Sequence, residues 1–161
     1  MNIKIKNVES YKDLALFWDM FYEYINDIFE TSSEDPKILN YFLSEDYKKE
    51  VINLSERDFN PLRIVFFTLN EKIIGFATYM IFINEFGKSK ILEFYINKDF
   101  RAQSLGTLSF LKLQKQMIKE GAKLIELTPT NNRNQSFWIE NGFKKTSLFY
   151  SDGRNILSKT L

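Results

Sequence analysis

Residues 100–110, FRAQSLGTLSF, combine a positive charge, a run of small residues and an apolar pattern with helical spacing. Residues 89–96 have the composition of a strand, so the segment predicts a loop that leads from a strand into a helix. The first N–H groups of a helix lack partners within it, and together with the helix dipole they attract anions. Arg101 adds a cation, and Gly106 lets a ligand approach the backbone closely. The segment is therefore a candidate anion site, although a plain connection in front of a core helix has the same features.

The chain contains no cysteine and no histidine. These absences exclude Cys–His and Ser–His–Asp nucleophilic catalysis, thiolate and imidazole metal sites, disulfide bonds and a histidine general base. There is no G-x-G-x-x-G motif, and Phe82 stands where a P-loop ending in Gly87-Lys88-Ser89 needs its first glycine. Any chemistry must therefore use carboxylates, tyrosines, backbone amides or water, and nucleotide hydrolysis is not expected.

Carboxylates that could accept a proton or hold a cation lie in two places. Glu93 interrupts an otherwise apolar strand, which makes it a candidate base or acceptor anchor, or else an exposed or ion-paired strand residue. In the first helix, acidic residues recur at helical spacing and form one face, which is either a solvated surface or a negative rim that attracts a cation. This face contains Asp19, Glu23, Asp27 and Glu30.

The elements that must position these groups follow from periodicity and turn signals. Ser10, with Asp13 three residues later, starts the first helix. Its apolar stripe is Leu14, Phe17, Phe21, Tyr24 and Ile28, and the stripe of the helix over 104–120 contains Leu105, Leu108, Leu111 and Ile118. The expected helices are 10–29, 35–57, 104–120 and 134–141, and the expected strands are 3–8, 62–69, 72–83, 89–96, 122–128, 143–150 and 155–161.

This order of elements predicts an α+β fold in a single domain, residues 1–161. The sheet is expected to be mixed and largely antiparallel, with about seven strands flanked by about four helices. Apolar residues make up 44% of the chain, which is enough for a packed core, and no apolar run is long enough to span a membrane. Since the N-terminus lacks a signal-peptide pattern, a cytoplasmic protein without a membrane partner is expected.

Charge is divided unevenly along the chain. Residues 1–87 carry 9 Lys and Arg against 15 Asp and Glu, a balance of −6, and residues 88–161 carry 13 against 6, a balance of +7. The basic half would suit an anionic ligand and the acidic half a cationic one, or the two halves neutralise each other. Nucleic acid is not expected as a partner, because the acidic half would repel a phosphate backbone.

The segment from Ile91 to Lys145 resembles the core of the GCN5-related N-acetyltransferase (GNAT) superfamily. In that family a valine-like residue ends a strand, and the pattern Arg/Gln-x-x-Gly-x-Gly/Ala begins five positions later. Ile96 and residues 101–106, RAQSLG, stand at these positions. Downstream the family has an asparagine, an aromatic pair in a short helix and Gly-Phe, which here are Asn131, Phe137-Trp138 and Gly142-Phe143.

The resemblance implies an enzyme without a metal that transfers an acetyl group from acetyl-CoA to a primary amine of a small cationic molecule. Transfer would be direct, in a ternary complex, since no cysteine can form an acyl-enzyme. Members of the family often form homodimers.

The resemblance also implies how acetyl-CoA would bind. Its pyrophosphate would contact the amides of residues 102–107, with Arg101 adding charge, and its pantetheine arm would pair with the strand edge 94–96 and with Asn131. The Ile96 N–H group would face the thioester oxygen. The implied cofactor-binding residues are Phe94, Tyr95, Ile96, Arg101, Ala102, Gln103, Ser104, Leu105, Gly106, Thr107, Asn131, Phe137 and Trp138.

Two positions depart from the family pattern. Ser104 replaces the first glycine of the loop, where a Cβ atom would crowd phosphates or strain a positive φ, while a hydroxyl could donate to phosphate and cap the helix. Trp138 stands where many members have a tyrosine proposed to protonate the CoA thiolate, and an indole N–H is not a useful acid. Tyr150 and Tyr79 are then candidate acids, and Glu93 is the candidate base. The alternative function is a catalytically weak or inactive domain that binds or senses acyl-CoA.

Overall fold

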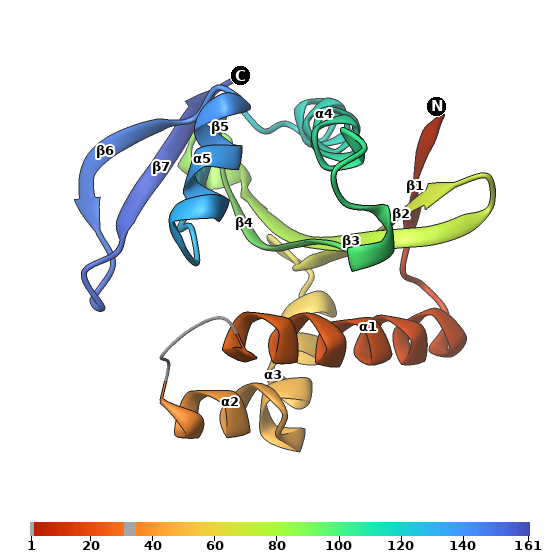
Figure 1. Ribbon diagram of the computed structural model, residues 1–161. Helices are drawn as coiled ribbons and strands as arrows, with labels where there is room; N and C mark the ends of the chain where they lie inside the picture. The colour runs from red at the N-terminus through yellow and green to blue at the C-terminus, as the bar shows by residue number, and fades with distance from the viewer. Residues whose placement is uncertain (1, 31–34) are drawn as a thin grey trace.

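The computed structural model describes residues 2–30 and 35–161. Figure 1 shows one sheet with α4 above it and with α1, α2 and α3 below it. Among the described residues, no helix is long and apolar enough to cross a membrane. The strands are β1 (Ile3–Asn7), β2 (Arg63–Leu69), β3 (Lys72–Phe82), β4 (Lys88–Ile96), β5 (Leu124–Leu127), β6 (Lys144–Phe149) and β7 (Asn155–Thr160), and the helices are α1 (Tyr11–Glu30), α2 (Pro36–Phe42), α3 (Glu45–Ser55), α4 (Leu105–Lys119) and α5 (Asn132–Glu140).

The seven strands lie in the order β1-β2-β3-β4-β5-β7-β6. All neighbours are antiparallel except β4 and β5, which are parallel, so the sheet is mixed and largely antiparallel, as predicted. The register between β4 and β5 covers only Lys88–Lys90 against Leu124–Glu126. Beyond residue 90, β4 continues along β3 alone, which leaves the other edge of residues 91–96 without a neighbouring strand in the described part of the chain.

A β-bulge in β4 determines which side chains face which layer. Thr78 of β3 pairs with Glu93 and the next residue, Tyr79, pairs with Ile91, so Leu92 is an extra residue on β4. After the bulge, Glu93 and Tyr95 point towards α1. Without the bulge, strict alternation from Ile91 would place Glu93 on the opposite face, in the apolar layer under α4.

The core consists of two apolar clusters, one on each face of the sheet. The first packs α4 and α5 against the sheet through residues such as Leu105, Phe110 and Trp138. The second packs α1 and α3 against the opposite face, with Phe17, Phe21, Tyr24, Val51 and Phe76 among its buried members. Because both faces are covered, β3 in the centre is buried along almost its whole length.

In the described residues, five α-helices flank the sheet rather than the expected four, because the region 35–57 is divided. Asp35 caps α2 and Pro36 occupies its first turn, as the sequence indicates. The helix ends at Phe42, and Ser44 then accepts a hydrogen bond from the Tyr47 N–H at 3.2 Å and starts α3. Ser10 caps α1 in the predicted way, accepting from the Asp13 N–H at 3.0 Å.

The buried face of α4 differs from the predicted one. Leu105 is buried as expected and Leu108 partly, but Leu111 and Ile118 are 42% and 45% exposed. Steps of three residues rotate by about −60° per step around a helix, so a row at 105, 108 and 111 turns away from the sheet. Steps of four residues rotate by a smaller angle around the helix. The buried row is therefore Leu105, Ser109, Leu113 and Met117, with Phe110 beside it.

Candidate active site

The loop between β4 and α4 presents a continuous set of backbone donors. It runs through a short 3-10 helix, Lys98–Phe100, and then through residues 101–104 into the first turn of α4. The N–H of Arg101 donates to Lys98 O and that of Leu108 to Ser104 O. Within the described chain, none of the N–H groups of residues 102–107 has an acceptor. They lie at the positive end of the α4 dipole, the arrangement that binds phosphate groups.

Two residues of this loop have left-handed backbone. Ala102 has φ 62° and Ser104 has φ 58°, a conformation that non-glycine residues rarely adopt. Alternation of left-handed and ordinary residues turns successive N–H groups into one concavity, which suits an anion. Serine therefore occupies a position that favours glycine, and the strain expected there is present. Its hydroxyl makes no capping hydrogen bond, so the expected helix cap is not formed.

The Arg101 side chain is held by the protein. Its Nε donates to Ile96 O at 2.8 Å and its Nη2 lies 2.8 Å from Asp27 Oδ2 on α1. The guanidinium also lies over the Tyr95 ring, at 5.4 Å from the centroid. Lys98 pairs with the same Asp27 at 2.9 Å. Much of the Arg101 charge is therefore compensated by α1, and the loop amides are the free donors at this site.

The open edge of β4 carries backbone groups that face away from β3. The Asn97 N–H donates to Ile74 O of β3 at 2.9 Å. Because backbone groups alternate across a strand, those of Ile96 and Phe94 point to the opposite edge, where Ile96 O accepts from Arg101. The groups of Tyr95 point towards β3, and its side chain packs against Tyr24 and Phe76. Of residues 94–96, Phe94 and Ile96 are thus the ones placed to pair with a ligand.

Gly106 allows α5 to approach the start of α4. A Cβ atom at this position would lie 3.2 Å from Phe137 Cε2, a contact that requires the ring to move. Phe137 also stacks on Phe94, with 5.8 Å between ring centroids. The glycine therefore serves helix packing next to the loop, in addition to any approach of a ligand.

Trp138 lies in α5, and Asn131 directly precedes this helix. Trp138 is buried among Phe94, Phe110 and Phe143, and its Nε1 donates to Asn134 Oδ1 at 3.2 Å. Its N–H is therefore occupied by Asn134. Asn131 caps α5 by accepting from the Asn134 N–H at 2.8 Å, and no hydrogen bond from its Nδ2 is found among the described residues.

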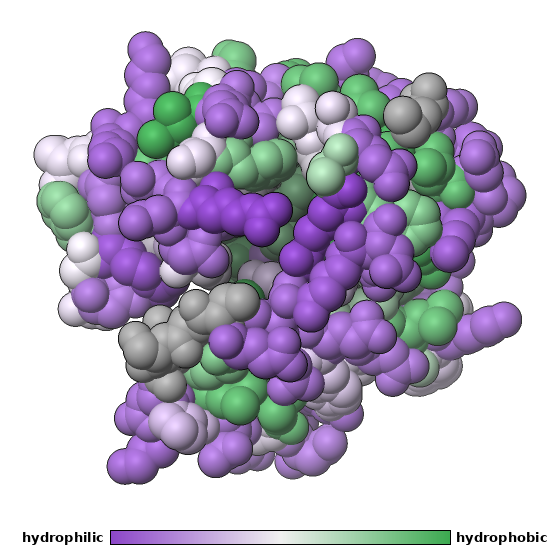
Figure 2. All heavy atoms as spheres, viewed as in Figure 1, coloured by the Kyte–Doolittle hydropathy of each residue, from purple (hydrophilic) through white to green (hydrophobic). Residues whose placement is uncertain are grey.

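A pocket of about 450 Å³ lies on the α1 side of the sheet, where β4 and β5 diverge. Its walls are mainly aromatic and aliphatic and come from α1, α2 and α3 as well as from the sheet. The face of the molecule in Figure 2 is largely hydrophilic, with exposed hydrophobic residues in small groups. Its lining residues include Tyr24, Phe29, Tyr47, Lys90, Glu93, Glu126, Asn131, Tyr150, Asp152 and Arg154.

Glu93 lies in the wall of this pocket, where Tyr24 of α1 donates a hydrogen bond to its Oε2 at 2.6 Å. Burial raises the pKa of the Glu93 carboxyl group to about 7, against the opposing effects of the Tyr24 hydrogen bond and the Arg154 charge. Burial and the nearby carboxylate raise the pKa of Tyr24 well above its ordinary value, so Tyr24 stays protonated and remains a donor. Near neutral pH, Glu93 can therefore exist in both protonation states.

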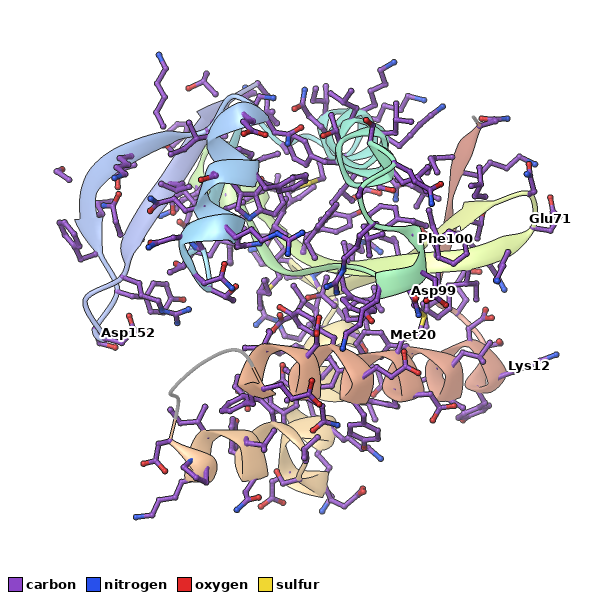
Figure 3. All side chains as sticks on the ribbon, viewed as in Figure 1. Lys12, Met20, Glu71, Asp99, Phe100 and Asp152 are labelled. Atoms are coloured by element: carbon purple, nitrogen blue, oxygen red, sulfur yellow. The ribbon has the colours of Figure 1, made fainter. Side chains whose placement is uncertain are left out.

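The other charged groups of the pocket are largely paired. Glu126 of β5 is buried and lies 3.4 Å from Lys88 Nζ. Arg154 makes an ion pair of 2.7 Å with Asp152, in the turn between β6 and β7 that Figure 3 shows at the end of that hairpin. The sequence predicts no functional part for Glu126 or Arg154. Only the pairing of β4, β5 and β7 brings them beside Glu93, and no local motif marks them.

The two tyrosines considered as acids lie in different places. Tyr150 is 48% exposed and lines the pocket together with Glu93. The Tyr79 side chain is buried between β3 and α4, where its hydroxyl donates to Glu120 at 2.9 Å and accepts from Gln116 at 3.0 Å. Tyr79 therefore lies outside the pocket and is not a candidate acid.

Comparison with known proteins agrees with this geometry. Residues 18–143 match the model of the Acetyltransferase (GNAT) family. No curated protein matches the chain in sequence. Among solved structures, paiA N-acetyltransferase from Thermoplasma acidophilum in complex with coenzyme A is similar over 100% of both chains, with a TM-score of 0.77 and 21% identity.

Two further structures show the same fold. An aminoglycoside acetyltransferase in complex with coenzyme A is 18% identical, with a TM-score of 0.67, over 99% of this chain and 95% of its own. Tetrahymena GCN5 is 12% identical, with a TM-score of 0.70, over 99% and 96%. The unpaired amides of residues 102–107 and the open edge of β4 are the groups that a pyrophosphate and an amide-containing arm require, so the residues present fit coenzyme A.

Proposed function

The chain belongs to the Acetyltransferase (GNAT) family and uses acetyl-CoA as its donor, and we propose that it acetylates the primary amine of a small cationic acceptor by direct transfer in a ternary complex. The observation that carries this proposal is the position of the Glu93 pocket. It lies beside the open edge of β4, which itself leads into the unpaired amides of residues 102–107. The acetyl group of a donor bound along this edge would thus lie next to an acceptor in the pocket.

On the donor side, most of the proposed contacts with acetyl-CoA come from backbone groups. The amides of residues 102–107 would hold the pyrophosphate, and Phe94, Ile96 and Asn131 would hydrogen-bond the pantetheine arm. Ile96 would donate its N–H to the thioester oxygen, where negative charge develops during transfer. Arg101 would act chiefly by fixing the loop between β4 and α4 to α1, since Asp27 of α1 already engages its guanidinium.

On the acceptor side, the pocket suits a small amine. Its volume of about 450 Å³ admits a small molecule, and the faces of Tyr24, Tyr47 and Phe29 can hold a cation or an apolar carbon chain. Since Lys88 and Arg154 compensate Glu126 and Asp152, Glu93 is the carboxylate in this pocket without a cationic partner within ion-pair distance among the described residues. The ammonium group is therefore expected to bind at Glu93.

Acid and base have separate places in this scheme. Acetyl-CoA supplies an acyl carbon attached to a thiolate leaving group. Glu93 removes a proton from the bound ammonium, directly or through water, so that the nitrogen lone pair can form the new C–N bond. Water takes the second proton, which the nitrogen loses as the amide forms. Tyr150 supplies a proton to the sulfur as the C–S bond breaks and the thiolate leaves with its electron pair. Solvent restores the protonation states of both residues.

The proposal is tested by release of free CoA from acetyl-CoA in the presence of a panel of amines. The panel holds polyamines, aminoglycosides, amino acids and peptide N-termini, and the variant Glu93→Gln is measured beside the parent. We expect turnover on at least one small amine and a loss of turnover in Glu93→Gln with CoA affinity unchanged.

A catalytically weak or inactive acyl-CoA-binding domain is the second candidate. The observation that favours it is Trp138, whose N–H is already bonded to Asn134 in the place where many family members have an acidic hydroxyl. Tight binding of acetyl-CoA with no CoA release on any amine would support this function and contradict the enzymatic one.

A further inference from the structure

The hydrogen bond between Tyr24 and Glu93 joins two parts of the chain that are 69 positions apart. Tyr24 lies in the fourth turn of α1, and its ring packs edge-on against Phe76 and beside Tyr95. These contacts leave the ring few alternative positions, because Phe76 is fully buried. The hydroxyl is therefore fixed at one point of the pocket wall, 2.6 Å from Glu93 Oε2.

No other group of the described chain donates a hydrogen bond to the Glu93 carboxylate. Groups that face it come from every neighbouring element: Tyr47 of α3, Lys90 of β4, Glu126 of β5, and Tyr150, Asp152 and Arg154 around the turn between β6 and β7. Arg154 acts on Glu93 by its charge but is held by Asp152. Tyr24 is thus the contact that sets the direction of the carboxylate.

We propose that Tyr24 is a positioning residue for acetyl transfer, whose hydroxyl aims Glu93 into the acceptor pocket and stabilises its ionised form. This inference rests on the proposed role of Glu93 as the base. By occupying Oε2, Tyr24 leaves Oε1 to accept the proton of the acceptor amine, and it remains the donor throughout because Glu93 titrates first.

The size of the effect follows from the hydrogen bond. Bonds to charged groups contribute about 1.5–3 kcal/mol, but a protonated carboxyl group also bonds a hydroxyl, so only the charge-dependent part is lost when the hydroxyl is removed. In Tyr24→Phe the apparent pKa of Glu93 should therefore rise by about 1 unit. On the acid side of the profile, kcat/KM should fall about tenfold, and above the raised pKa the two enzymes should converge.

The test compares Tyr24→Phe with two matched variants. Tyr47→Phe removes another hydroxyl from the pocket wall that makes no hydrogen bond to Glu93. Tyr41→Phe removes a different tyrosine–glutamate hydrogen bond, to Glu50, outside the pocket. For each protein, the pH profile of kcat/KM is measured, and the Glu93 carboxyl group is titrated by NMR in the ligand-free protein with isotope-labelled glutamate. The variant Glu93→Gln assigns the resonance and also serves as the background for a double mutant.

We expect the pH profile of kcat/KM and the Glu93 titration to shift upward in Tyr24→Phe and to stay in place in Tyr41→Phe. In Tyr47→Phe, whose ring lines the acceptor pocket, the Glu93 titration alone is compared, and it should stay in place. In the Glu93→Gln background, Tyr24→Phe should have no further effect. A Glu93 titration that moves by less than about 0.3 unit in Tyr24→Phe would overturn the inference. If Glu93→Gln retains the turnover and pH profile of the parent, the proposed base is wrong. The NMR titration still decides separately whether Tyr24 controls the ionisation of Glu93.

Discussion

Replacing Asp27 by asparagine should weaken the binding of CoA, although Asp27 lies on α1 and not in the loop itself. Its carboxylate joins two residues of the β4–α4 connection, Lys98 at 2.9 Å and Arg101 at 2.8 Å. The same connection lies over α1 in Figure 3, where its residues Asp99 and Phe100 are labelled. In Asp27→Asn, Arg101 loses its charged partner and Lys98 keeps only the longer pair with Glu30, at 4.0 Å. The left-handed residues Ala102 and Ser104 then lose support for a strained conformation.

The magnitude follows from the exposure of the three side chains. Asp27 is 17% exposed, Arg101 35% and Lys98 56%. Exposed ion pairs contribute about 0–1 kcal/mol and breaking a buried one costs about 3–5 kcal/mol, so this half-exposed pair should cost about 1–2 kcal/mol. If the loop must then be ordered again by the ligand, the Kd for CoA should rise about 5- to 30-fold.

Calorimetric titration with CoA measures this change directly. The matched control is Asp19→Asn, on the same acidic face of α1 but with no ion pair in the described structure, and its Kd should equal that of the parent. An Asp27→Asn protein that binds CoA as tightly as the parent would refute the reasoning, because the contact with α1 would then contribute nothing to the loop. An equal loss of affinity in Asp19→Asn would also refute it. The loss would then follow from the overall charge of α1 and not from its contact with the loop.

Three further predictions concern the loop, the base and the acid. Gly106→Arg should abolish CoA binding in the same calorimetric assay, because the side chain must displace Phe137 or fill the space in front of the loop. Gly106→Ala should weaken binding less. Normal binding by Gly106→Arg would mean that the CoA site lies elsewhere. In the parent, the free energy of unfolding should fall as pH rises from 4.5 to about 7, because the folded protein holds the Glu93 proton in this window and the unfolded chain does not. The fall is worth up to roughly 3 kcal/mol, and Glu93→Gln should lack it. Chemical denaturation at a series of pH values measures the free energy of unfolding of both proteins. Parallel plots of this free energy against pH would contradict the raised pKa of Glu93. Tyr150→Phe should lower kcat by about 10²-fold with the KM for acetyl-CoA unchanged, and an unchanged kcat in steady-state kinetics would leave water as the proton donor.

Local signals in the sequence were sufficient where an element depends on its own residues. The caps at Ser10 and Asp35, the meander of β2, β3 and β4, and the strand–loop–helix order at residue 100 are all observed. The division between α2 and α3 also has a local signal, because Ser44 followed by Glu45 and Asp46 is a pattern typical of a helix start.

Features that depend on contacts distant in sequence could not be predicted in this way. The predicted positive charge for phosphate at Arg101 is directed instead to Asp27, which lies 74 positions away. The candidate base Glu93 was recognised as an acidic residue in an apolar strand, but its donor Tyr24 was assigned only to the apolar stripe of a helix. Both pairings arise from α1 crossing the end of β4, and neither residue type nor spacing encodes that crossing.

Amide resonances of the isotope-labelled protein, followed during titration with acetyl-CoA, test the central claim most directly. The account predicts that the largest changes occur at residues 102–107 and at Phe94 and Ile96, with Tyr95 and the amides along the rest of α4 changing less. Changes concentrated elsewhere on the molecule, with these amides unaffected at saturation, would contradict it.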